Sequence, residues 1–124
     1  MKVLVADLFS EDGIKDMQAS GIEVIYDHAL NGESLQKAMA EHLPTILVVR
    51  STKVTKEIVD ANPKLQMVIR AGAGYDTIDV VHCAKNGIYV TNCPGKNATA
   101  VAELTLGLIL AIDRRMAEGV NLLK

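Results

Sequence analysis

The sequence predicts an α/β fold built on an open sheet of five parallel strands, with helices on both faces and a further helix after the sheet. Two observations predict it. Short runs of β-branched and other apolar residues alternate with segments whose apolar residues recur at helical spacing. Several of the short runs are apolar at every position, which is typical of parallel strands covered on both faces. Ligands of such sheets bind at the carboxyl ends of the strands.

The individual elements follow in order along the chain. Strands are predicted at residues 2–6, 23–26, 45–49, 66–69 and 88–90, and helices at 10–19, 33–41, 55–61 and 77–85. Glycine, proline and asparagine mark the helix ends. These residues are Gly21 after the first helix, Asn31-Gly32 before the second, Pro44 after it and Asn86-Gly87 after the fourth. The resulting layer is predicted to be flavodoxin-like and to end near Asn92.

Composition argues against several classes of function. The 124 residues can form one domain with a core of aliphatic side chains, because hydrophobic residues make up 49% of the chain and aromatic residues only 3%. The net charge of −2 is spread along the sequence, so no basic face indicates binding to nucleic acid or to an anionic membrane. The apolar run at the N-terminus is too short for a signal peptide and ends at Asp7, so we expect a cytoplasmic protein.

The cysteines and histidines show no pattern of a reactive or metal-binding cluster. Cys83 is expected on the apolar side of the fourth helix and Cys93 in a loop, both as plain thiols. His28, His42 and His82 are the only histidines that could act as a general base, and each lies in or beside a helix, away from the turns that follow the third and fourth strands. We therefore assign no catalytic residue and no metal ligand.

A long apolar segment follows the layer. Between residues 98 and 112 only Thr99, Glu103 and Thr105 are polar, so a helix there is apolar around most of its circumference. Such a helix needs cover on several sides. We therefore expect residues 1–95 to form one domain and residues 96–124 to form an interdomain helix that leads to a second domain of a longer protein. Residues 98–116 are expected to form a homodimer contact.

Two turns at strand ends carry the candidate binding residues. One turn follows the third strand, and a glycine-rich turn follows the fourth, so both emerge at the same edge of the sheet. Exposed backbone N–H groups suit a carboxylate, glycines allow positive φ and close approach, and arginine or lysine suits a phosphate. The sequence therefore predicts a small anionic ligand. Its candidate contacts are Arg50, Ser51, Lys53, Arg70, Ala71, Gly72, Ala73 and Gly74.

Four motifs, taken in order, resemble the D-2-hydroxyacid dehydrogenase family. They are RSTKVT at 50–55, KLQMVIRAGAGYDTID at 64–79, NGIYVTNCPG at 86–95 and AVAELT at 100–105. Within the family they are nearest to the branch that acts on phosphorylated hydroxy acids. The sequence departs from that branch because the Arg50 turn is one residue shorter, Thr77 replaces an asparagine and Ala73 stands where threonine is frequent.

The resemblance implies a two-domain oxidoreductase in which this layer binds the substrate and a Rossmann domain binds NAD. It implies that the backbone at 71–74 holds the substrate carboxylate and that Ala73 lies near the nicotinamide. Arg50, Lys53 and Arg70 would face the active cleft, and the apolar helix would join the two domains and the dimer contact. The family's nucleotide fingerprint and its catalytic arginine, glutamate and histidine match no segment of the 124 residues, so we expect this chain alone to be inactive.

Other interpretations stay open at this point. A glyoxylate or hydroxypyruvate reductase, or a corepressor-type member of the same family, would share these motifs. A free-standing flavodoxin-like binding module would share the fold. A receiver domain is disfavoured because Val49-Arg50 stands where a phosphoacceptor aspartate is needed, and a dinucleotide fingerprint is disfavoured because Thr77 occupies its third glycine position. A tight turn beside a solvated arginine is the simplest alternative for the glycine-rich turn.

Overall fold

The computed structural model describes residues 1–122 and divides the chain into two compact units, Met1–Pro94 and Gly95–Lys124. The first unit holds one sheet of five parallel strands in the order β2-β1-β3-β4-β5. This confirms the predicted sheet. The strands are β1 (Lys2–Val5), β2 (Glu23–Tyr26), β3 (Ile46–Val49), β4 (Met67–Arg70) and β5 (Tyr89–Thr91), and the helices are α1 (Glu11–Ala19), α2 (Gly32–His42), α3 (Lys56–Asp60) and α4 (Val80–Lys85).

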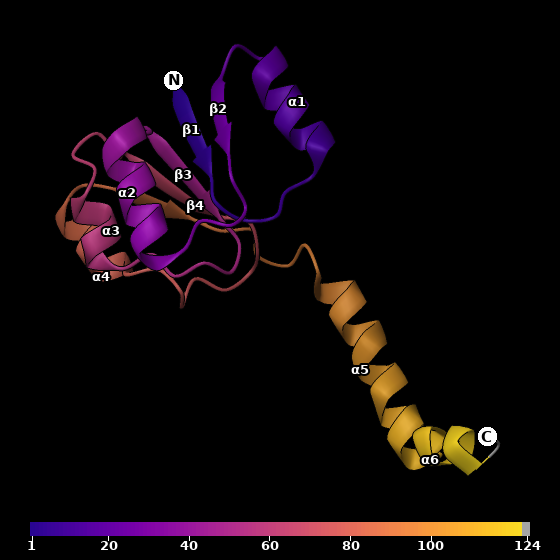
Figure 1. The fold of residues 1–124 in the computed structure, drawn as a ribbon. Helices are drawn as coiled ribbons and strands as arrows, with labels where there is room; N and C mark the ends of the chain where they lie inside the picture. Colours follow the sequence, from indigo (N-terminus) through magenta and orange to yellow (C-terminus); the bar gives the residue numbers. More distant parts are fainter. Residues whose placement is uncertain (123–124) are drawn as a thin grey trace. The chain divides into compact units, whose positions relative to one another are not determined.

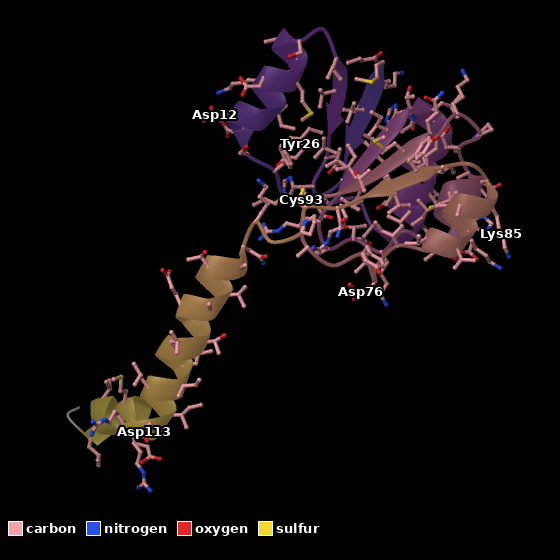
Figure 2. The ribbon with its side chains drawn as sticks, turned by 180° about the vertical axis from the view of Figure 1, so that it is seen from behind. Asp12, Tyr26, Asp76, Lys85, Cys93 and Asp113 are labelled. Carbon is pink, nitrogen blue, oxygen red and sulfur yellow. The ribbon has the colours of Figure 1, made fainter. Side chains whose placement is uncertain are left out.

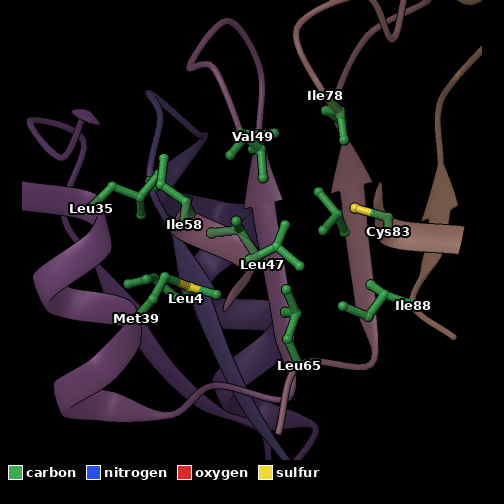
Figure 3. Packing of buried hydrophobic residues seen from close by; sticks show 14 of the residues in the cluster. Leu4, Leu35, Met39, Leu47, Val49, Ile58, Leu65, Ile78, Cys83 and Ile88 are labelled. Carbon is green, nitrogen blue, oxygen red and sulfur yellow. The ribbon is translucent and has the colours of Figure 1, made fainter. Parts of the chain in front are cut away.

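Helices cover both faces of the sheet (Figure 1). On one face, α2, α3 and α4 pack on the larger apolar cluster, in which Leu4, Leu47 and Val68 from three neighbouring strands are fully buried. Figure 3 shows Leu47 at the centre of this cluster. On the other face, α1 places Ile14 against Val3, Val5 and Val48 in a smaller cluster. The middle strands are therefore buried on both sides, as their continuously apolar sequence predicts.

Local chemistry sets the helix ends. Ser10 caps α1 by accepting a hydrogen bond from the Gly13 N–H. Asn31 and Ser34 form a capping box at the start of α2. Helix α2 ends at His42. The next residue, Leu43, is the C-cap and has a positive φ of 46°, and Pro44 after it cannot continue the helix.

The start of the fourth helix differs from the prediction by three residues. The segment 77–85 was expected to be helical throughout, but α4 begins only at Val80. Ile78 forms a parallel bridge with Val54, and the carbonyl of Thr77, which lies in a turn, accepts from the Val54 N–H. Asp79 then caps the helix by accepting from the His82 N–H. Long-range pairing thus overrides the local helical pattern for two residues.

The second unit contains α5 (Ala98–Asp113) and α6 (Met116–Leu122). Helix α5 has no buried residue, and its aliphatic side chains are exposed on several sides. The sequence predicts a single interdomain helix over residues 96–124, whereas the structure has a break between α5 and α6. Helix α6 follows Arg115, whose positive φ of 48° breaks the helical path. Among residues 1–122, no helix is both long enough and apolar enough to cross a membrane.

Candidate anion-binding site at the carboxyl ends of β3 and β4

The two predicted turns leave the sheet side by side. Val49 at the end of β3 is in register with Arg70 at the end of β4, and the Ala71 N–H donates to the Val49 carbonyl over 2.7 Å. Further along, Val54 donates to the Thr77 carbonyl at 2.8 Å and accepts from the Asp79 N–H at 3.0 Å. The segments that contain residues 50–54 and 71–79 are therefore joined at both ends by backbone hydrogen bonds.

Asp7, which the sequence did not single out as a site residue, holds the turn after β3. It lies two residues beyond the end of β1, the neighbour of β3 in the sheet. Its Oδ2 accepts from three consecutive backbone N–H groups, those of Arg50 at 2.7 Å, Ser51 at 3.0 Å and Thr52 at 3.0 Å. Its Oδ1 accepts from the Ser51 hydroxyl at 3.1 Å. One carboxylate thus fixes the backbone of the whole turn.

These hydrogen bonds change the acidity of Asp7. Partial burial raises the pKa of the carboxyl group, but the hydrogen bonds from the Arg50, Thr52 and Ser51 backbones outweigh it and leave the pKa below its usual value. The ionised form is therefore favoured in the folded state. This carboxylate contributes stability above the unfolded-state pKa of about 4, and that contribution is lost as the pH falls through the lowered pKa.

Asp7→Asn is expected to lower the free energy of unfolding by about 1–2 kcal/mol near neutral pH, because the hydrogen bonds to a charged acceptor become neutral ones. The difference from the unsubstituted chain should shrink as the pH falls from about 4 through the lowered pKa of Asp7. Urea unfolding at a series of pH values measures it. Asp12→Asn, at a side chain that is 95% exposed, is the matched control. If Asp7→Asn lowered the free energy of unfolding by the same amount at every pH, the stabilising role of the ionised Asp7 carboxylate would be contradicted.

The glycine-rich turn presents fewer free N–H groups than predicted. The Ala71 N–H is bonded to Val49, and the Gly72 N–H donates to the Arg70 carbonyl at 2.8 Å. Within residues 1–122, no acceptor contacts the N–H groups of Ala73 and Gly74. Of the backbone N–H groups at 71–74 that the resemblance implies as carboxylate contacts, those of Ala73 and Gly74 are therefore the free ones.

The loop after β5 holds the glycine-rich turn in place. The Asn92 side-chain amide donates to the Ala73 carbonyl at 2.6 Å, and the Cys93 N–H donates to the Gly72 carbonyl at 2.9 Å. Figure 2 shows Cys93 in this loop and Asp76 on the loop that follows β4. Because their carbonyl groups are tied to the loop, the peptide planes of Gly72 and Ala73 are fixed. The turn is thus preorganised.

Gly72 is required for space and not for its backbone angle. Neither Gly72 nor Gly74 uses the positive φ that glycine allows, since the glycines with positive φ among the described residues are Gly21, Gly32, Gly87 and Gly95. A Cβ at Gly72 would lie 2.5 Å from Cζ of Arg70 and would also overlap Nη1. The Arg70 guanidinium therefore lies directly over Gly72. Its Nε is buried, and no partner for it is found among the described residues.

The turns after β3 and β4 carry three cationic side chains, those of Arg50, Lys53 and Arg70. None of the ion pairs found within residues 1–122 includes Arg50, Lys53 or Arg70. Arg50, Ser51 and Lys53 are exposed, and Lys53 also lines a cavity of about 490 Å³ beside the start of α2. Unpaired cations next to free N–H groups can bind a small anion, with a carboxylate on the amides and further negative charge on the side chains.

Comparisons with known proteins identify the family to which the chain belongs. The family profile for "D-isomer specific 2-hydroxyacid dehydrogenase, catalytic domain" matches residues 3–120. The chain belongs to this family of D-2-hydroxyacid dehydrogenases. It is 40% identical over its full length to 23% of a D-3-phosphoglycerate dehydrogenase from Methanocaldococcus jannaschii. It is 43% identical over 87% of its length to 35% of a hydroxypyruvate reductase from Thermotoga maritima.

Solved structures agree with the family assignment. The chain superposes on 38% of the NAD+-bound 3-phosphoglycerate dehydrogenase of Entamoeba histolytica with a TM-score of 0.78, 33% identity and 90% of this chain covered. The chain thus spans about a quarter to two fifths of the length of these dehydrogenase relatives.

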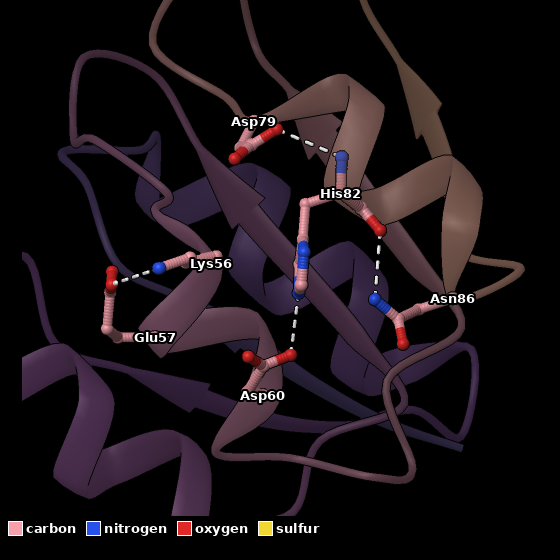
Figure 4. A network of polar contacts seen from close by, with 6 residues as sticks. All are labelled: Lys56, Glu57, Asp60, Asp79, His82 and Asn86. Atoms are coloured by element: carbon pink, nitrogen blue, oxygen red, sulfur yellow. Dashed lines mark hydrogen bonds and ion pairs between the residues drawn. The ribbon is translucent and has the colours of Figure 1, made fainter.

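The three histidines lie outside the turns that follow β3 and β4. His82 Nε2 lies 2.6 Å from Oδ1 of Asp60 and so links α4 to α3 (Figure 4). In the same network, the His82 carbonyl accepts from the Asn86 side chain. His28 packs against Tyr26. His82 and His28 thus contact other side chains outside the turns after β3 and β4.

The two cysteines also behave as expected of plain thiols. Cys83 is fully buried, and burial, aided by the negative charge of Asp79, raises the pKa of its thiol. Cys93 is exposed and free. A raised pKa disfavours the reactive thiolate at Cys83, so we assign it a packing role.

Proposed function

We propose that this chain is the substrate-binding domain of an NAD-dependent D-2-hydroxyacid dehydrogenase that oxidises the C2 hydroxyl of D-3-phosphoglycerate, the reaction that opens serine biosynthesis. The observation that carries the proposal is the unpaired Arg70 over Gly72, beside the free N–H groups of Ala73 and Gly74. The similarity to phosphoglycerate dehydrogenases supports it. We place the enzyme in the cytoplasm.

In this proposal the domain binds and orients the acid. The substrate carboxylate accepts from the Ala73 and Gly74 N–H groups, and Arg70 neutralises its charge. Arg50 and Lys53, on the adjoining turn, suit the phosphate at the other end of the molecule. Anchoring both ends fixes C2 in one orientation, which is how binding energy is used to lower the barrier to reaction.

The cofactor would meet this domain at Ala73. The methyl side chain of Ala73 is small and half-buried, which leaves room for a planar ring next to the turn. NAD, when bound, accepts the hydride that leaves C2. No histidine of the described residues lies in the turns after β3 and β4, so in this proposal the proton is taken by a group of the nucleotide-binding domain. We therefore expect the 124 residues alone to give no turnover.

Hydroxypyruvate reductase is the second candidate, favoured by the 43% identity to the Thermotoga protein. Its substrate carries no phosphate, so Arg50 and Lys53 would have no anionic partner. A corepressor-type function has no supporting observation at this site. Comparing D-glycerate with D-3-phosphoglycerate as ligands separates the two enzymatic candidates, because only a phosphate-binding site prefers the phosphorylated acid.

Arg70→Ala is expected to weaken binding of D-3-phosphoglycerate about tenfold or more, because a charge-assisted contact to an anion is worth about 1.5–3 kcal/mol. Titration of the 15N-labelled chain, followed through the Ala73 and Gly74 amides, measures the affinity. Arg114→Ala, at a side chain of the second unit that is 75% exposed, is the matched control. Equal affinities for both variants would overturn the assignment of Arg70 to the substrate.

We also propose that the chain forms a homodimer through residues 98–116. The supporting observation is the exposed aliphatic surface of α5, which is larger than isolated domains ordinarily leave in water. The chain should sediment as a dimer at micromolar concentration. Leu106→Glu should give a monomer, whereas Leu8→Glu, at an exposed leucine of the first unit, should not. A monomeric unsubstituted chain would rule this out.

A further inference from the structure

The turns after β3 and β4 both follow neighbouring parallel strands, but they differ in what their backbone N–H groups bind. In the turn after β3, the N–H groups of Arg50, Ser51 and Thr52 converge on one oxygen of Asp7. In the turn after β4, the N–H groups of Ala73 and Gly74 meet no acceptor in the described part of the chain. One amide cluster is thus occupied by a carboxylate of the protein itself, and the other is open.

Without Asp7, the first turn would be the stronger anion site. Three successive N–H groups aimed at one point form a concave donor set that binds anions in many proteins. The side chains of Arg50 and Lys53 on the same turn add positive charge. The second turn offers only two N–H groups and Arg70. An external carboxylate would therefore bind to the turn after β3 in preference to the turn after β4, unless the first of these were already occupied.

We propose that Asp7 is a positioning residue that acts as a built-in anion: it fills the amide cluster at Arg50–Thr52 and so directs an external carboxylate to Ala73 and Gly74. This inference rests on the proposed function, because it explains how one of two neighbouring turns is selected. It also assigns separate tasks to the first turn. The backbone of that turn is committed to Asp7, while the exposed side chains of Arg50 and Lys53 stay available for a second negative group of the ligand.

The contacts of Asp7 agree with this task. It comes from a different strand than the turn it fills, 43 residues away from Arg50 in sequence, so the contact does not form within the turn. Both carboxylate oxygens are used, because Oδ1 accepts from the Ser51 hydroxyl while Oδ2 accepts the three amides. The N–H groups of Arg50–Thr52 and the Ser51 hydroxyl are therefore not available to an external anion.

The test uses sodium formate as the probe carboxylate in a chloride-free buffer, with 15N-labelled chain. In the unsubstituted chain, formate should shift the amides of Ala73 and Gly74 and leave those of Arg50–Thr52 unmoved. In Asp7→Ala, formate should in addition shift the Arg50–Thr52 amides with a saturable, millimolar curve. Asp7→Asn should not gain this site, since the carboxamide oxygen still fills the cluster. Asp12→Ala, which removes an exposed carboxylate, should behave like the unsubstituted chain.

A merely structural role for Asp7 would not create a new formate site. The inference is overturned if Arg50–Thr52 respond in the unsubstituted chain, or fail to respond in folded Asp7→Ala. If Asp7→Ala does not fold, recovery of its native spectrum by formate supports the inference and lack of recovery overturns it. Failure of the proposed function is distinct, because it would appear as unshifted Ala73 and Gly74 amides in every variant, whatever Arg50–Thr52 do.

Discussion

Gly72→Ala is expected to reduce the affinity for D-3-phosphoglycerate about tenfold, or ~1.4 kcal/mol, while leaving the fold intact. The added methyl group would occupy the space of the Arg70 guanidinium, so this side chain has to move away from the turn. The move is inexpensive for folding because the displaced atoms are the far end of a flexible side chain. Gly72 also has no positive φ, so alanine fits its backbone, and the free energy of unfolding should change by less than about 1 kcal/mol.

Two comparisons isolate the cause of this effect. At Gly74, a Cβ would meet only Oδ1 of Asp76, at 3.0 Å, so Gly74→Ala should change the affinity much less. In a double-mutant cycle, adding Gly72→Ala to Arg70→Ala should cost no further affinity, because the side chain that the methyl group displaces is already gone. Additive losses in this cycle would show that Gly72 contributes to binding by another route.

Leu47→Ala is expected to have the largest effect on stability, lowering the free energy of unfolding by about 3–4 kcal/mol. Leu47 is 0% exposed on the middle strand, where it lies in register between Leu4 and Val68, which are also 0% exposed. The strands on either side cannot close the cavity without breaking their backbone pairing. Because domains of this size are stable by only about 5–15 kcal/mol, the loss should shift the urea midpoint strongly.

Leu8→Ala is the matched control for this substitution. It removes the same atoms from a side chain that is 65% exposed, so the free energy of unfolding should change by no more than about 0.5 kcal/mol. Circular dichroism during urea unfolding, at one protein concentration for all variants, measures both. Similar losses for Leu8→Ala and Leu47→Ala would contradict the burial described here.

Most of the fold could be predicted because its determinants are local. Continuously apolar runs identify buried parallel strands, and Asn31, Pro44 and Gly87 mark helix ends by their own backbone chemistry. The errors arise where a distant segment decides. Thr77 and Ile78 have a helical pattern but pair with Val54, whose position no local rule reveals.

The candidate site was predictable only in outline. The strand-end position of Arg50 and Arg70 follows from the sheet, but the role of Asp7 depends on a contact 43 residues away, and the sequence offers an acidic residue after β1 as its only signal. At Gly72 the sequence predicts close approach to the backbone but does not show which group approaches. The sequence shows that a side chain is absent there, but only the structure shows that Arg70 fills the space.

The paired hydrogen bonds of Val54 have a consequence for how this site recognises its ligand. Val54 ties the end of the Arg50 turn to both Thr77 and Asp79, and so to the segment that carries the glycine-rich turn. The two ends of a bound acid would therefore rest on one framework instead of two independent loops. A ligand that carries both a carboxylate and a phosphate would therefore bind to two turns whose spacing is already set, without having to order either of them.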